Sequence, residues 1–116
     1  MDRALMIVAG LAGAAGVALA AAGAHIAGAE RLATAGQMAM AQAPALLALG
    51  LYGTARGRLM TLSAVLIAVG VLVFAGALAF HDLSGSAALA FVAPWGGTAM
   101  IIGWLGIIAA AVMRRR

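Results

Sequence analysis

Four stretches of the 116-residue chain contain no charged side chain, and each is long enough to cross a lipid bilayer. They cover roughly residues 4–24, 36–55, 59–80 and 87–113. A spanning helix needs about 20 apolar residues, because about 30 Å of hydrocarbon is crossed at about 1.5 Å per residue. Inside hydrocarbon, each segment must satisfy its own backbone hydrogen bonds. The four stretches are therefore predicted to be helices.

The composition of the chain supports the membrane class. The sequence is 66% hydrophobic and 9% charged, and its mean hydropathy is +1.15. A soluble domain of this length exposes too much of its surface to hide so many apolar side chains. The chain contains no cysteine, which excludes disulfides and thiolate metal sites. We expect one all-α domain over residues 1–116, an integral membrane four-helix bundle.

The first apolar stretch also has features of a cleavable signal peptide. Arg3 precedes it, and small residues over 20–24 suit a signal peptidase. The run is about 20 residues long, however, whereas the apolar region of a signal peptide has about 7–15. We therefore predict a retained first helix. The predicted helices cover about residues 4–24, 34–55, 59–80 and 94–113, with a short interfacial helix over about 87–93.

Two prolines interrupt the apolar stretches. Pro44 lies inside the second predicted helix, where it removes one N–H group and favours a kink. Pro94 allows two interpretations of the last stretch: one long kinked helix, or a short interfacial piece followed by a spanning helix that begins at Pro94. We favour the second, because proline suits the first turn of a helix and Trp95 suits the membrane interface.

The arginines predict the orientation of the chain. If the four helices alternate, the N-terminus, the loop between helices two and three, and the C-terminus share one side of the membrane. That side holds six arginines: Arg3, Arg56, Arg58, Arg114, Arg115 and Arg116. By the positive-inside rule both termini of this multi-pass protein are expected on the cytoplasmic side. The net charge of +4 therefore points to membrane lipids as partners and not to nucleic acid.

Small residues line one side of the first predicted helix. Gly16, Ala20 and Ala24 continue a four-residue repeat that starts at Ala12. Helices in a bilayer associate by close van der Waals contact, which such residues permit. Two interpretations remain open, packing inside the bundle and an interface between copies. The residues predicted to pack helices together are Gly16, Ala20, Ala24, Gly76 and Gly103.

Polar residues inside a membrane are costly and often mark a functional site. Here they gather toward the predicted outer side, and the candidate ligand or interhelical site is His25, Gln37, Gln42, Trp95, Gly96, Gly97 and Thr98. Gln42 could bond a neighbouring helix or contact a ligand. No histidine pair has the spacing of metal ligands on a helix, so no metal or cofactor is expected. No nucleophile has a visible base beside it, and we expect no enzyme activity.

Several short segments carry a family resemblance. They are Gly23-Ala24-His25, residues 45–49, Gly70 with the run 74–78, Pro94-Trp95-Gly96-Gly97 and Gly103-Trp104. These segments resemble the YgdD family, domain-of-unknown-function family 423, whose eukaryotic relatives are called transmembrane protein 256. The resemblance implies four spanning helices, an inner-membrane location and no established activity. The chain departs from the family pattern at Gln42, where the family often has histidine, and at Ala75 and Ala77, where it often has serine.

Two functions are compatible with these features. The first is a non-catalytic accessory or scaffold, which contacts other membrane proteins or a second copy, or holds a lipid-like molecule between its helices. The alternative is a small-solute transporter or channel that acts as an oligomer. Proton-coupled export is disfavoured, because it needs a carboxylate inside the membrane and none lies within the four apolar stretches.

Overall fold

The computed structural model describes residues 1–113, apart from the side chain of Thr54. The predicted topology residues Arg114, Arg115 and Arg116 lie outside the described residues. Four α-helices follow one another, with a short 3-10 helix after the second and another before the fourth. They are α1 (Arg3–His25), α2 (Glu30–Tyr52), η1 (Gly53–Arg56), α3 (Arg58–Ser84), η2 (Ala90–Val92) and α4 (Ala93–Met113).

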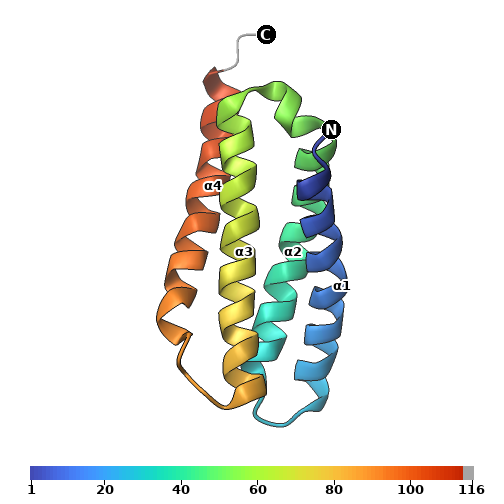
Figure 1. The fold of residues 1–116 in the computed structure, drawn as a ribbon, viewed down its shortest axis with the longest axis vertical. Helices are drawn as coiled ribbons and strands as arrows, with labels where there is room; N and C mark the ends of the chain where they lie inside the picture. Colours follow the sequence, from blue (N-terminus) through green and yellow to red (C-terminus); the bar gives the residue numbers. More distant parts are fainter. Residues whose placement is uncertain (114–116) are drawn as a thin grey trace.

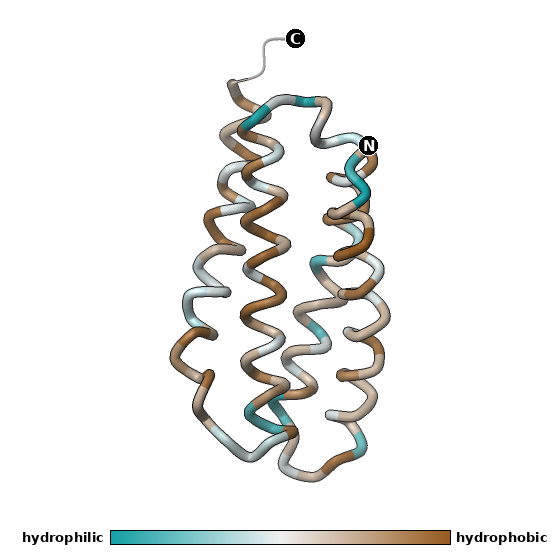
Figure 2. Tube along the Cα trace, viewed as in Figure 1, coloured by the Kyte–Doolittle hydropathy of each residue, from teal (hydrophilic) through white to brown (hydrophobic). Residues whose placement is uncertain are grey.

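All four α-helices are long and apolar enough to cross a membrane, which agrees with the all-α membrane fold predicted from the sequence. The molecule is tall and thin, with dimensions of 51 × 24 × 18 Å. Figure 1 shows the helices side by side along the longest dimension, and the start of α1 and the end of α4 lie at the same end. Hydrophobic residues follow the helices over most of their length (Figure 2).

The start of α2 differs from the prediction. The helix begins at Glu30, four residues before the predicted boundary, and Ala29, the residue before it, has no side chain that could cap it. The capping group comes instead from the last turn of α3, where the carboxylate of Asp82 accepts a hydrogen bond from the Leu32 N–H at 3.0 Å. An N-terminal N–H group of a helix needs such an acceptor. Because the acceptor is 50 residues away in the chain, the local sequence did not show it.

The segment around Pro94 forms a short connection and then a helix. The spanning helix α4 begins at Ala93, so that Pro94 lies in its first turn. The short helix expected over residues 87–93 is only the 3-10 turn Ala90–Val92. The helix α2 continues without interruption through Pro44.

The helices pack as two hairpins. Helix α1 packs mainly on α2, and α3 packs mainly on α4, while α2 and α3 join the hairpins. In the first hairpin, a Cβ atom added to Gly36 would lie 2.6 Å from the carbonyl oxygen of Gly16. In the second, a Cβ atom added to Gly70 would lie 2.7 Å from the carbonyl oxygen of Gly96, and the reverse distance is also 2.7 Å. The backbones approach this closely because glycine has no side chain.

The core lies where the two hairpins meet. Leu32 and Leu46 of α2 and Ile67 and Val71 of α3 are almost completely buried. Their large apolar side chains fill the space that the glycine contacts do not close.

The predicted packing residues have mixed outcomes. Gly16 contacts α2, and a Cβ atom on Gly103 would lie 2.8 Å from the Ser63 carbonyl oxygen. As contacts inside the bundle, the predictions for Ala24 and Gly76 are wrong; a place for them at an interface between copies stays a prediction. Ala24 is exposed, because a four-residue repeat turns about 40° per step on a helix of 3.6 residues per turn and moves off the contact face. Gly76 has no atom within 4 Å of an added Cβ, because it faces away from α4.

Ala20, the remaining member of this set, is half-buried at the α1/α2 contact. Its backbone nitrogen is the atom nearest to a Cβ added to Gly36. Ala20 therefore contributes to helix packing because its backbone lies close to α2.

Candidate functional site

The seven residues of the predicted polar site do not form one cluster. His25, Gln37 and Thr98 are exposed, and Trp95 is 72% exposed. The Thr98 hydroxyl donates a hydrogen bond to the Pro94 carbonyl oxygen within its own helix, at 2.8 Å. These four side chains point outward, toward the surroundings of the bundle.

The two glycines of the predicted site serve packing between α3 and α4. A Cβ atom on Gly96 would lie 2.6 Å from the backbone nitrogen of Phe74, and one on Gly97 would lie 3.7 Å from the Phe74 ring. Gly96 is buried and Gly97 is half-buried. The Pro94-Trp95-Gly96-Gly97 segment therefore starts a helix and places it directly on α3.

Gln42 is the buried polar residue of the predicted set. Its side-chain oxygen accepts a hydrogen bond from the Trp104 indole N–H at 2.8 Å, and its amide nitrogen donates to the Met38 sulfur at 3.6 Å. Trp104 belongs to α4, so this bond joins the two hairpins across the middle of the molecule. Sequence reasoning missed the partner, because it lies 62 residues away and no local pattern marks the pair.

A second polar contact joins the hairpins at the end that holds the α1–α2 loop. Arg31 forms an ion pair with Asp82 at 3.2 Å, beside the capping bond to Leu32. The Asp82 side chain is 6% exposed and that of Arg31 is 48% exposed. Within residues 1–113, no three His, Cys, Asp or Glu side chains gather in a group that could hold a metal ion. The ion pair and the capping bond together hold the start of α2 against the end of α3.

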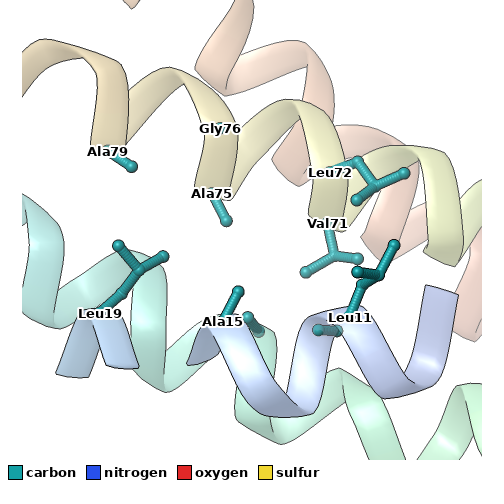
Figure 3. Close-up of a pocket in the computed structure, with 10 residues that line it drawn as sticks. Leu11, Ala15, Leu19, Val71, Leu72, Ala75, Gly76 and Ala79 are labelled. Carbon is teal, nitrogen blue, oxygen red and sulfur yellow. The ribbon is translucent and has the colours of Figure 1, made fainter. Parts of the chain in front are cut away.

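An apolar groove lies between α1 and α3, and we name it the α1/α3 groove (Figure 3). Its volume is about 190 Å³, and almost all of its lining surface is apolar. Figure 3 shows side chains from the two helices on opposite walls. The lining residues are Leu11, Ala12, Ala15, Leu19, Ala39, Val71, Leu72, Ala75, Gly76 and Ala79.

The α1/α3 groove exists because small residues face each other across it. Ala15 on one wall and Ala75, Gly76 and Ala79 on the other reach only a short way into the space. The glycine contacts hold α1 against α2 and α3 against α4, so the direct contact between α1 and α3 is slight. Gly76, which was predicted to pack against a helix, instead forms part of the open wall.

A second apolar groove lies between α1 and α2. It is wider and more open, with a volume of about 440 Å³. Its lining residues are Met6, Ala9, Gly10, Gly13, Val17, Met40, Ala43, Pro44 and Leu47. None of the seven predicted polar residues lines either groove. The sequence signal for both grooves is the high content of alanine and glycine in α1, which sequence reasoning assigned to helix contacts, either inside the bundle or between copies.

The comparisons with known proteins identify a family. No curated protein and no solved structure matches the chain. The family described as "Protein of unknown function (DUF423)" matches residues 19–97, which is more than half of the 116 residues. This segment contains the Gly70–Gly96 contact and ends before Trp104. The family resemblance seen in the sequence is therefore confirmed, and the chain belongs to the DUF423 family of proteins of unknown function.

Proposed function

We propose that the protein is a non-catalytic membrane protein that holds the acyl chain of a lipid or lipid-like molecule in the α1/α3 groove. The observation that carries the proposal is the groove itself, with its apolar lining and its position between spanning helices. From Leu11 to Leu19 the α1 wall extends about 12 Å, at about 1.5 Å per residue. This length is close to half the hydrocarbon thickness, about 15 Å, which is the depth of one lipid leaflet.

The size of the groove favours an acyl chain over a helix. A helix with its side chains is about 10 Å across, and it would need far more than the 190 Å³ present here. An empty gap between packed helices would lose dispersion contacts on both walls. A flexible hydrocarbon chain restores those contacts with Leu11, Leu19, Val71 and Leu72 and requires no polar partner.

The test is photolabelling of the purified protein in phospholipid vesicles. The vesicles contain phosphatidylethanolamine and phosphatidylglycerol, with a small fraction of phospholipid that carries a photoreactive group on its acyl chain. We expect peptides over residues 11–19 and 71–79 to be labelled more strongly than the exposed residues Ile101, Ile102 and Leu105 of α4. Equal labelling of all three segments would contradict the proposal.

Two variants sharpen this test. Gly76→Leu adds a side chain to the open wall of the groove, where an added Cβ meets no atom within 4 Å, and we expect it to lower groove labelling to the α4 level. Ala18→Leu is the matched control, because Ala18 is exposed on α1 and lines neither groove. Loss of labelling in both variants, or in neither, would argue against an acyl chain in the groove.

We also propose that the protein lies in a bacterial inner membrane with both termini in the cytoplasm. Arg3, Arg56 and Arg58 support this orientation, because they lie at the end where α1 and α3 begin. The natural chain has no cysteine, so single cysteines report the topology. Ala55 in η1 and Ala87 in the α3–α4 connection are both exposed. We expect Ala55→Cys to react with an impermeant thiol reagent from the cytoplasmic side and Ala87→Cys from the opposite side. Reaction from the same side would overturn the orientation.

The alternative function, solute passage through an oligomer, has no specific observation in its favour. Such a path needs polar groups that are free to meet the solute. Among the described residues, the buried amide of Gln42 is already bonded to Trp104 and Met38.

A further inference from the structure

Gln37 is a polar side chain on the outer surface of a spanning helix. It is exposed, and it forms no side-chain hydrogen bond within residues 1–113. Gln37 lies four residues, about 6 Å, from the middle of α2. With that middle at the bilayer centre, Gln37 is about 9 Å from the nearer edge of the hydrocarbon, which extends about 15 Å to either side. The side chain is too short to reach the interface from this depth. Its amide is therefore in contact with hydrocarbon or with another protein.

An amide in hydrocarbon without a partner is unfavourable, because nothing there replaces its hydrogen bonds to water. A glutamine side chain carries both donors and an acceptor. It is therefore complementary to a second glutamine placed opposite it. Lipid acyl chains offer no such group.

The residues around Gln37 form a continuous contact face. Exposed residues of α2 recur with alternating spacings of four and three, which is the pattern of a left-handed helix pair. We name this face the Gln37 seam; it consists of Glu30, Thr34, Gln37, Ala41, Pro44 and Ala48. Within the membrane its other members are short side chains, so that a second helix can approach closely.

We propose that the Gln37 seam is the interface of a homodimer, in which α2 of a second copy packs in parallel against α2. Two copies with the same topology are related by an axis along the membrane normal, so each residue meets its equivalent at the same depth. Gln37 then faces Gln37, and each amide donates an N–H to the oxygen of the other. A different partner would need a polar group at this depth, whereas a second copy supplies it automatically.

The Gln37 seam is independent of the proposed lipid site. Ala39, the α2 residue in the α1/α3 groove, is two residues from Gln37, which places it on the opposite side of the helix. A dimer formed through the seam therefore leaves the groove accessible from the membrane.

The first experiment is disulfide crosslinking of the full-length protein at high dilution in phosphatidylethanolamine and phosphatidylglycerol vesicles. Ala41→Cys places a thiol on the seam one turn from Gln37, and with copper phenanthroline and oxygen as the oxidant we expect rapid formation of a disulfide-linked dimer. Ala14→Cys places one on the exposed face of α1 and should form little dimer. Equal crosslinking at both positions, or none at Ala41→Cys, would overturn the proposal.

The second experiment measures the dimerisation constant by energy transfer between labelled copies. Gln37→Leu should raise the dissociation constant about sevenfold, the factor for two interhelical hydrogen bonds of average measured strength in membranes. Ala41→Ile adds bulk to the seam and should abolish the dimer, whereas Ala14→Ile, the matched control on α1, should leave it unchanged. A dimer unaffected by both Gln37→Leu and Ala41→Ile would show that the interface lies elsewhere.

Discussion

The contact between α3 and α4 gives the sharpest test of how this fold is held together. We consider Gly96→Ala, the addition of one methyl group. An alanine Cβ at this position would lie 2.6 Å from the Phe74 backbone nitrogen and 2.7 Å from the Gly70 carbonyl oxygen. Both neighbours are backbone atoms of α3, and they cannot move aside as a flexible side chain can. The whole helix must shift.

The size of this shift sets the expected loss of stability. Ordinary nonbonded contacts are about 3.5 Å or longer, so the two helices must separate by about 1 Å at this point. A gap of 0.5–1 Å removes about a quarter to a half of the dispersion attraction of each contact beside it. Substitutions that overfill a packed site typically cost about 1–3 kcal/mol. We therefore expect Gly96→Ala to lower the free energy of unfolding by about 2 kcal/mol.

The assay is unfolding in mixed micelles by increasing amounts of sodium dodecyl sulfate, followed by circular dichroism and by the fluorescence of Trp95 and Trp104, both on α4. Gly76→Ala is the matched control, since its added methyl meets no atom within 4 Å. Because alanine is favoured over glycine inside a helix, this variant should keep its stability or gain up to about 1 kcal/mol. Equal stability loss in the two variants would refute the role of the Gly70–Gly96 contact. So would a Gly96→Ala protein as stable as the natural one.

Two further predictions concern the polar contacts between the hairpins. Asp82→Ala should lower the thermal midpoint in detergent more than Arg31→Ala. Asp82 accepts hydrogen bonds from both the Arg31 side chain and the Leu32 N–H, whereas the loss of Arg31 leaves the bond to Leu32 in place. A larger effect of Arg31→Ala would contradict the capping role of Asp82. Gln42→Leu and Trp104→Phe, measured singly and together, should show a coupling of about 0.6 kcal/mol, the average for interhelical hydrogen bonds in membranes. Strictly additive effects would mean that this bond contributes nothing to stability.

The sequence predicted the helices but not which side of each helix faces a neighbouring helix. The four spanning segments were evident from charge-free runs, and α1 agrees with its predicted boundaries within one residue at each end. The use of glycine for close packing was also correct at Gly16 and Gly103. The face on which each small residue lies was not predictable for Gly76, because a glycine at a contact and a glycine lining a groove look alike in a sequence.

The candidate site could be predicted only in part. Because a polar side chain inside a membrane is unfavourable unless it is bonded, the sequence marked Gln42 as a candidate. In the structure Gln42 forms a buried hydrogen bond with Trp104. The same reasoning grouped it with Trp95 and Thr98, which lie on the outside of α4. Polarity and approximate depth can be read from a sequence, whereas the rotation of each helix about its axis depends on its neighbours.

The sequence by itself determined that this chain forms four helices long and apolar enough to span a membrane. Each charge-free segment must satisfy its backbone hydrogen bonds internally in hydrocarbon, and that requirement does not depend on any other segment. Only the tertiary structure decided which helices pair and where a groove remains. Those features depend on contacts such as Gly70 with Gly96 and Gln42 with Trp104, between residues far apart in the chain. In a membrane, where lipid and side chains are equally apolar, such contacts depend on shape and hydrogen bonding, and both appear only once the helices meet.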